Sequence, residues 1–465
     1  MTEAKIIWPP YPYEAGFCIT DDPDASTFAQ TRAVYDFLTS KSFVTTKAVW
    51  AFKPETQCGI PPIPDSALRG ISLFDSDFAS YCDDLSKNGF ELCLHGASAG
   101  NNTREHTQKA FRLLAGRYGH FDTFICHSKN ADNIYWEEKT TSLFPFRLLL
   151  NLYSKHTCSG EILGSPYYWG DLCSSTINQI RLYRTPCCNT LRRNPSMPYF
   201  DPEKPLVNGW FSATKRSLAD CAEDWELETL KKENGLTVLY QYMHRYADRE
   251  TNALDTRFVR GVNSISNDTK ILVDTVSSMM KRLRQIQGVF VLFQENSFWL
   301  LNVNSEAIDN LQVKTSRPLD VDVQDDSIKS IGHFLVVKHL PGNSVKRVRV
   351  SDSIIFSQNH SSALNRSRQI IFKIPFGNVS VNLSETDVRT TDNDIIPHGS
   401  FILKTRRSGT GFPLLSVISK KEEFGLLSDQ MGLIGREVLF KGRSLKIEKY
   451  LDSSREIPME NHDNW

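Results

Sequence analysis

The sequence has neither an excess of charge nor a long apolar run. Its 465 residues contain 54 Lys and Arg against 54 Asp and Glu, so the formal net charge is zero. This balance argues against nucleic acid or an anionic membrane as the main partner. The apolar runs are interrupted within about ten residues, which is too short for a transmembrane helix. The first residues also lack the apolar core and the small-residue cleavage site of a signal peptide.

The ten cysteines follow no metal-binding or disulfide pattern. They are scattered along the chain, and neither CxxC pairs nor zinc-ribbon spacings occur. Cys187 and Cys188 are adjacent, which is more often incidental than functional. Because no secretion signal is evident, we predict a cytoplasmic protein whose thiols stay reduced.

The first half of the chain does contain a regular alternation of strands and helices. An apolar fraction of 40% with 11% aromatic residues suits a globular protein with a sizeable core and two or three domains. Hydrophobic periodicity predicts strands at 16–20, 45–50, 90–95, 121–127 and 236–244, and helices near 26–41, 78–85 and from 103 onward. Repeated strand-loop-helix units predict an α/β fold with a parallel sheet or barrel.

The first of these strands ends on three carboxylates, Asp21, Asp22 and Asp24, around Pro23. Proline cannot donate to a strand ladder, so the strand should end there. The carboxyl ends of parallel strands are where α/β folds keep their chemistry. Adjacent aspartates repel each other, and a bound cation would relieve the repulsion. The alternative is a solvated acidic turn that caps the following helix.

Three later strands end on histidines: His95, His127 and His244. A single histidine at a strand end is usually a hydrogen-bonded structural residue. In a parallel sheet or barrel, however, all carboxyl ends point the same way, so the three can meet the aspartates. Aspartate and histidine together form a normal ligand set for zinc or a similar divalent ion.

These segments resemble motifs of the polysaccharide deacetylases, the NodB-homology domain of carbohydrate esterase family four. Thr20-Asp21-Asp22-Pro23 resembles the "TFDDG" motif, residues 89–96 resemble the "GHEIGSH" motif, and Met243-His244 resembles the "LLH" motif. The resemblance covers roughly residues 8–290. It implies a distorted (β/α)7 barrel of the glycoside hydrolase/deacetylase type.

The resemblance also implies a metal-dependent hydrolase that deacetylates an N-acetylated amino sugar or polysaccharide. Carried over by position, Asp21 is the catalytic base, Asp22 and His95 are metal ligands, and His244 is the acid. The metal, commonly zinc, polarises the substrate carbonyl and activates water. Such a protein is a hydrolase of carbon-nitrogen bonds other than peptide bonds.

The sequence departs from the family pattern at three points. Ala99 stands where the second motif has its other histidine, Pro23 replaces a glycine, and the "RxPY" motif is not evident. We predict that His127 substitutes as the third metal ligand. His106 is another candidate, but inside its predicted helix a surface histidine is the simpler interpretation.

We predict substrate contacts from polar and aromatic residues near these strand ends. Asn130 follows His127 in a polar loop, and Asp24 follows the paired aspartates. Tyr168, Trp169 and Asp171 combine aromatic faces with a carboxylate, a pattern typical of sugar binding. The alternative for the aromatic segment is a buried cluster that covers the barrel.

The period changes to strands after residue 290. A predicted helix at 271–283 closes a first domain, 1–290, and strands follow at 289–293, 298–303, 334–337, 345–350, 370–374 and 379–383. Their spacing predicts a β-sandwich-like accessory domain over 291–465. Two alternatives to the deacetylase stay open. One is an altered or inactive barrel that binds a glycan, and the other is a glycoside hydrolase in which Asp171 partners an aspartate of the first strand.

Overall fold

The structure is a computed structural model that describes most of the first 356 residues and, beyond them, only short strands. Its described residues are 2–54, 70–127, 130–136, 158–192, 194, 197–199, 204–294, 296–302, 304–321, 327–356, 369–374, 377–382, 401–407, 413–419, 422–428, 437–440, 443–446, 451–452 and 455–456. Within this part of the chain, no helix is long and apolar enough to cross a membrane.

Seven parallel strands close into a barrel, which confirms the predicted (β/α)7 architecture. Each strand pairs in parallel with the next, and the last strand returns to the first. Around the ring the strands are β2 (Ala15–Asp21), β3 (Thr46–Val49), β4 (Glu91–Leu94), β5 (Thr123–Phe124), β6 (Gln179–Thr185), β7 (Trp210–Thr214) and β8 (Leu236–Gln241). An eighth strand, β9 (Ile271–Val273), pairs with the beginning of β2 outside the ring.

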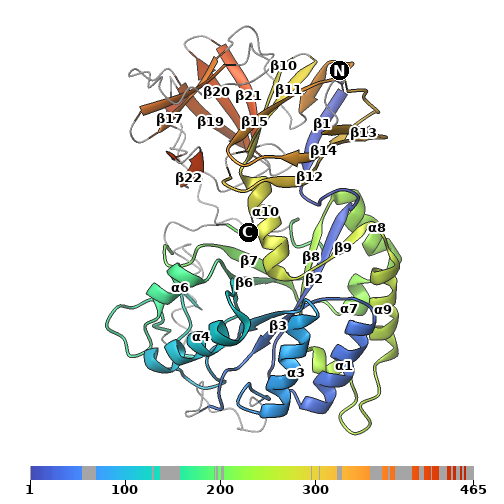
Figure 1. The fold of residues 1–465 in the computed structure, drawn as a ribbon, viewed down its shortest axis with the longest axis vertical. Coiled ribbons are helices and arrows are strands. Elements are labelled where there is room, and N and C mark those ends of the chain that lie inside the picture. Colours follow the sequence, from blue (N-terminus) through green and yellow to red (C-terminus); the bar gives the residue numbers. More distant parts are fainter. Residues whose placement is uncertain are drawn as a thin grey trace. The chain divides into compact units, whose positions relative to one another are not determined.

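Helices follow most of the barrel strands (Figure 1). They are α1 (Phe28–Ser40), α3 (Ser76–Lys87), α4 (Arg104–Tyr118), α6 (Gly170–Thr176), α7 (Leu218–Cys221), α8 (Asp224–Glu233), α9 (Thr256–Asn267) and α10 (Val276–Gln287), with a 3-10 turn, η2 (Met243–Tyr246). Threonine side chains cap two of these helices, α1 and α4. Thr27 accepts a hydrogen bond from the backbone of Gln30, and Thr103 accepts one from His106, so each satisfies a free N–H of the first turn.

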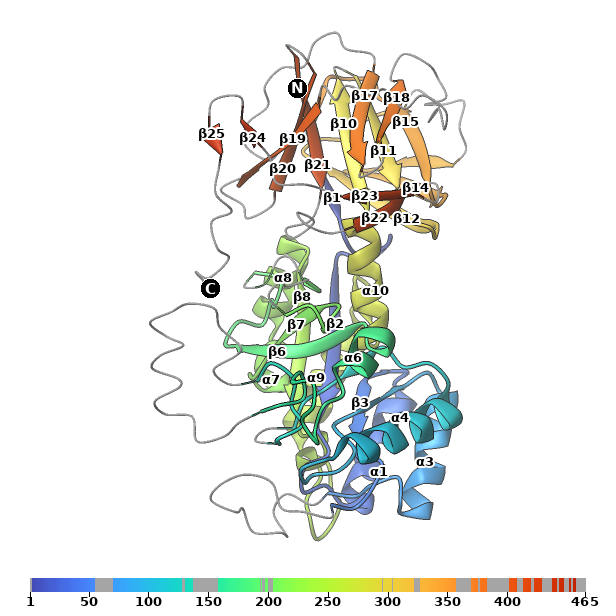
Figure 2. The same cartoon turned by 90° about the vertical axis from the view of Figure 1, so that its left-hand side faces the viewer.

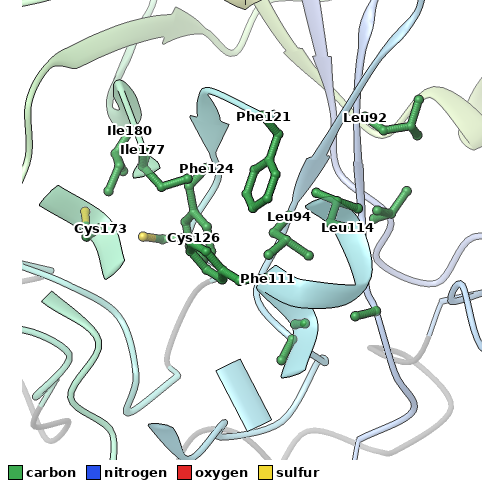
Figure 3. Packing of buried hydrophobic residues seen from close by; sticks show 14 of the residues in the cluster. Leu92, Leu94, Phe111, Leu114, Phe121, Phe124, Cys126, Cys173, Ile177 and Ile180 are labelled. Carbon is green, nitrogen blue, oxygen red and sulfur yellow. The ribbon is translucent and has the colours of Figure 1, made fainter. Parts of the chain in front are cut away.

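The alternation of side chains along each strand separates an outer core from the barrel interior. Leu94 and Phe124 face outward and pack with Phe111 and Leu114 of α4, as Figure 3 shows. Their strand neighbours face inward, where Ala48, Cys93 and Ile125 form a small separate cluster. Because His95 follows Cys93 by two residues, alternation turns His95 toward the interior, and the ring of His127 lies beside it with a centroid distance of 5.2 Å.

Three boundaries differ from the sequence predictions: the strand predicted at 121–127 covers only Thr123–Phe124, and the other two differ for physical reasons. The predicted helix at 271–283 begins only at Val276, because Ile271–Val273 pairs with β2 as strand β9. The predicted strand 236–244 ends at Gln241, and His244 lies in η2. There the N–H of Met243 donates to Asp21 at 2.8 Å, which turns the chain out of the strand ladder.

The remaining strands belong to a second compact unit, Met1–Pro12 with Lys281–Glu460, whereas the barrel unit spans Tyr13–Met280. β1 (Thr2–Ile7) joins this second unit, because it pairs with β12 and β16. The first twelve residues therefore belong to the second unit, whereas the predicted first domain, 1–290, includes them.

Two sheets account for most strands of the second unit (Figure 2). One has the order β13 (Ile328–Ile331), β14 (Phe334–Leu340), β12 (Ile308–Thr315), β1 and β16 (Ile354–Phe356). The other has the order β15 (Ser344–Arg349), β11 (Ser297–Asn302), β10 (Val289–Gln294), β21 (Glu422–Ser428), β20 (Pro413–Ser419) and β19 (Phe401–Arg407).

Short hairpins complete the described strands. They are β17 (Gln369–Ile374) with β18 (Gly377–Asn382), β22 (Glu437–Phe440) with β23 (Arg443–Lys446), and β24 (Leu451–Asp452) with β25 (Arg455–Glu456). All six strands predicted beyond residue 288 are present within about two residues of their predicted ends, apart from the longer β14. The sandwich packing of 291–465, much of which lies outside the described residues, stays a prediction.

Candidate metal centre

Asp24, His95 and His127 lie together at the carboxyl ends of β2, β4 and β5. Their ligand atoms all fall within 4.8 Å of one another, and all three residues are buried. His127 Nε2 is 2.9 Å from Asp24 Oδ1, and His95 Nε2 is 3.3 Å from Asp24 Oδ2. Among the described residues, this is the group of histidine and carboxylate side chains that could hold a metal ion.

The donor atoms of this group suit a divalent ion. Nitrogen and oxygen ligands lie about 2.0–2.2 Å from zinc, so two tetrahedral ligands are roughly 3.4 Å apart. The observed separations of 2.9 and 3.3 Å lie slightly below that spacing. Asp24 Oδ2 and His95 Nε2 are also buried without a hydrogen bond of good geometry within the described structure. Buried polar atoms normally have a partner, and a shared cation would provide one.

The two histidine rings also shift the acidity of the carboxylate between them. Burial by itself would raise the pKa of Asp24, but contacts with His127 and His95 outweigh it and hold the pKa well below its usual range. Asp24 is therefore ionised and available as a ligand. The ring of Trp50 packs against both histidine rings, with centroid distances of 5.9 Å to His95 and 5.7 Å to His127. This apolar side chain limits the access of water to the group.

The structure places Asp24, rather than the predicted Asp22, in contact with both histidines. Asp22 instead accepts two hydrogen bonds from Arg181 of β6, at 2.8 and 2.7 Å. Its Oδ2 is 3.7 Å from His95 Nε2, so it borders the ligand group. Burial would lower the pKa of Arg181, but the charge of Asp22 and its hydrogen bonds raise it above the usual value. Arg181 stays charged and holds the Asp22 carboxylate in one orientation.

Asp21, the catalytic base in the prediction, has its contacts on the outer side of the barrel wall. Neighbouring residues of a strand point to opposite faces, and Asp21 points outward where Asp22 points inward. Its carboxylate accepts hydrogen bonds from Lys47 at 2.7 Å, Tyr35 at 2.8 Å and the backbone of Met243 at 2.8 Å. Asp21 therefore anchors the barrel wall to α1 and η2.

His244 lies in η2, directly after the Met243 that Asp21 holds. Burial lowers the pKa of His244 to about 4, although the charges of Asp21 and Asp24 partly oppose the change. Its ring is therefore neutral near pH 7. Its Nδ1 is buried and has no hydrogen-bond partner within the described structure.

The predicted sugar-binding residues have internal partners. Trp169 is 0% exposed, packs 4.6 Å from the ring of Phe124 and donates to the backbone of Asp132. The alternative of a buried aromatic cluster is correct for this residue, because no face is left for a sugar. Asp171 forms two hydrogen bonds with Arg104, whose guanidinium also lies over Tyr168. These contacts hold Tyr168 and Asp171 with α4.

Asn130 is likewise engaged within the protein. Its Oδ1 lies 3.0 Å from His127 Nδ1, and its Nδ2 donates to the backbone oxygen of Gly100 at 2.8 Å. The structure thus brings this predicted substrate contact against a histidine of the ligand group. His106, the alternative ligand, stacks on Phe52 at 4.9 Å instead.

Sequence reasoning missed Arg181 and Lys47, the two buried cations beside the acidic segment. Both are less than 4% exposed. A basic residue inside an apolar strand segment is the signal that was available, since a buried cation requires a nearby carboxylate. For Arg181 the strand itself was not predicted, so its inward direction could not be read.

Comparisons with known proteins add little to this geometry. No protein-family model matches the chain, and no curated protein matches it. Among solved structures, the chain is similar to a protein from Mycobacterium smegmatis that is provisionally described as a polysaccharide deacetylase. The similarity has a TM-score of 0.33 and 10% identity, and it covers 59% of this chain and 93% of that one. At this level the assignment of the fold rests on the strand pairing alone.

Proposed function

We propose that the barrel is a metal-dependent hydrolase that removes an acyl group from an N-acylated amino sugar or polysaccharide. The observation that carries the proposal is the buried group of Asp24, His95 and His127 at the carboxyl end of a closed parallel barrel. Active sites of such barrels lie at this end. The three motif resemblances in chain order support the carbohydrate amide as substrate.

Asp24, His95 and His127 would hold the ion, and zinc suits this donor set. The bound ion would polarise the amide carbonyl and lower the pKa of water toward neutrality. Asp22 is the base in this proposal, in place of Asp21. Arg181 binds both Asp22 oxygens, but each oxygen keeps a second lone pair that can accept a proton from water.

His244 is proposed as the proton donor for the departing amine. Its place in η2, where Asp21 fixes the preceding backbone N–H, gives the ring a defined position near the acidic segment. With a pKa of about 4, the ring is neutral at pH 7 and offers an N–H rather than a full positive charge. His244 would accept at its lone-pair nitrogen the proton that Asp22 takes from water, and would pass a proton to the nitrogen of the departing amine.

The glycoside hydrolase alternative finds less support. A glycosidase needs one carboxylic acid that stays protonated near neutral pH. Asp171 does not meet this requirement, because its hydrogen bonds with Arg104 lower its pKa. The glycan-binding barrel without catalysis differs from the proposal only in turnover, so an activity measurement separates the two.

The direct test is release of acetate from N-acetylhexosamine oligosaccharides by zinc-supplemented protein, followed by proton NMR. We expect the Asp22→Asn variant to lose about 100-fold or more of kcat, because it removes the proton acceptor. The matched control is Asp171→Asn, an aspartate with an arginine partner away from the histidines, which should keep its activity. No acetate release by the wild type, or an active Asp22→Asn variant, would contradict the proposal.

A further inference from the structure

The side-chain amide of Asn130 has a defined orientation. Its Nδ2 donates to the carbonyl oxygen of Gly100 at 2.8 Å, so the other end of the amide, Oδ1, faces His127. Oδ1 lies 3.0 Å from Nδ1 of the His127 ring. An amide oxygen only accepts hydrogen bonds, so the ring nitrogen that faces it must carry the hydrogen.

This hydrogen bond determines which nitrogen of His127 can bind an ion. A neutral imidazole has one N–H and one lone pair, and Asn130 places the N–H at Nδ1. In the neutral ring that binds an ion, the lone pair is therefore at Nε2, the nitrogen that lies 2.9 Å from Asp24 Oδ1. We propose that Asn130 is a positioning residue that fixes the Nδ1–H tautomer of His127 and so presents Nε2 to a divalent cation.

Hydrogen bonds between the loop after β4 and the loop after β5 hold the two histidines of the group in place relative to each other. His95 and His127 follow different strands, β4 and β5, so no single turn sets their spacing. The loop after β4 is tied to the loop after β5 by Asn102, whose N–H and Nδ2 donate to Asp132 at 2.9 and 3.1 Å. The N–H of Ala131 donates to Asn101 at 2.8 Å.

Among these residues that link the two loops, Asn130 contacts the ring of a proposed metal ligand, His127. It bonds Gly100 in the loop after β4 and His127 in the loop after β5, and it is 1% exposed. Ala99, where the resemblance expects a second histidine, lies one residue before Gly100. A site with histidines from two loops thus gains its ring orientation from Asn130 rather than from a shared turn.

The metal-binding part of this inference rests on the proposed function, but the position of the hydrogen on the His127 ring can be tested without metal. The wild-type protein, labelled with 15N-histidine and free of metal, is studied by long-range proton-nitrogen NMR. The His127 signals are assigned by their loss in a His127→Gln variant. We expect a hydrogen on Nδ1 of His127, and a ring whose only N–H is at Nε2 would overturn the inference.

The second arm measures the affinity of the full chain for zinc by competition with a chelator. We expect Asn130→Ala to weaken zinc binding about 10- to 100-fold, the usual effect of removing the partner of a ligating histidine. The matched control is Asn133→Ala, which removes a buried amide that bonds the backbone oxygen of His127 at 2.6 Å and not its ring. Control and wild type should bind alike.

Equal losses in Asn130→Ala and Asn133→Ala would show a merely structural role and overturn the inference. If the wild type binds no zinc, the proposed function fails, while the tautomer spectrum still decides the placement of the His127 proton. The two failures are therefore distinguishable.

Discussion

Asp22 and Arg181 form an ion pair inside the barrel, with both side chains below 5% exposed. Removing one partner of a buried pair leaves the other charge without compensation. We predict that Arg181→Met lowers the free energy of unfolding by about 3–5 kcal/mol, measured by urea denaturation. Arg104→Met breaks the half-exposed pair with Asp171 and should lower it by less than about 1 kcal/mol. Similar losses in the two variants would contradict the burial of the Asp22 pair.

The low pKa of His244 makes stability depend on pH. Burial lowers this pKa to about 4, against roughly 6.5 in the unfolded chain. Between these values the unfolded chain binds more protons, so the contribution of His244 to the free energy of unfolding rises with pH from 4 to 6.5. We predict that the difference between wild type and His244→Gln changes by roughly 3 kcal/mol across this window, with metal-free protein in urea.

The comparison with the variant is needed because Asp132 has the opposite effect. Burial raises the pKa of Asp132 to about 6, so its contribution to stability falls as pH rises from about 4 to 6. The two contributions partly cancel in the wild type. A difference between wild type and His244→Gln that is constant with pH would contradict a buried, neutral His244.

At the scale of residues, the sequence located the acidic segment and its histidines but not every role. The alternation rule, applied within the first strand, would have separated outward Asp21 from inward Asp22. Asp24 follows the strand, beyond Pro23, where alternation no longer applies. Its contact with His95 and His127 depends on the path of the loop, which local sequence does not determine. The metal roles proposed for these residues stay predictions until an ion is measured.

The loop after β4 depends on one backbone conformation at Gly96, directly after His95. Gly96 has a φ of +100°, where an L side chain is strained, and a Cβ there would lie 3.4 Å from Asn102 Nδ2 and from the Ser98 oxygen. We predict that Gly96→Ala lowers the free energy of unfolding by about 1–3 kcal/mol. Chemical denaturation measures this change, and zinc titration should show weaker binding.

The control for Gly96 is Gly116, a glycine within α4 that has open space at the Cβ position. Replacing a glycine inside a helix by alanine stabilises the helix, so Gly116→Ala should raise the free energy of unfolding by about 0.5–1 kcal/mol. A neutral or stabilising Gly96→Ala variant would show that the loop after His95 does not need this conformation.

At the scale of elements, α1 and α4 were predictable because an apolar face and a cap coincide, whereas α9, which has both, was not predicted. Thr27 and Thr103 are such caps, and α1 and α4 begin directly after them. Strands were predictable when apolar, as β2, β3, β4 and β8 are. β6 escaped prediction because its polar residues, such as Gln179 and Arg181, face the interior and interrupt the apolar pattern. β9 escaped because three residues are too few to show a period.

At the scale of the whole molecule, alternating strands and helices indicated a parallel sheet, and only the resemblance implied seven strands. The barrel closes because β2 pairs with both β3 and β8. In the pairing with β8, Phe17 lies opposite Thr237, more than 200 residues away in the sequence. The place of β1 depends on its partners β12 and β16 in the same way. Long-range pairing of this kind leaves little trace in local composition. The cytoplasmic location likewise stays a prediction.

The central claim, that Asp24, His95 and His127 hold a divalent ion, is tested most directly by metal content. Full-length protein is incubated with zinc, dialysed and measured by inductively coupled plasma mass spectrometry. We predict about one ion per chain for the wild type and for the Asp171→Asn control, and almost none for Asp24→Ala, because the carboxylate that contacts both histidines is lost. A wild type without a stoichiometric ion, or an Asp24→Ala variant that keeps it, would contradict the claim.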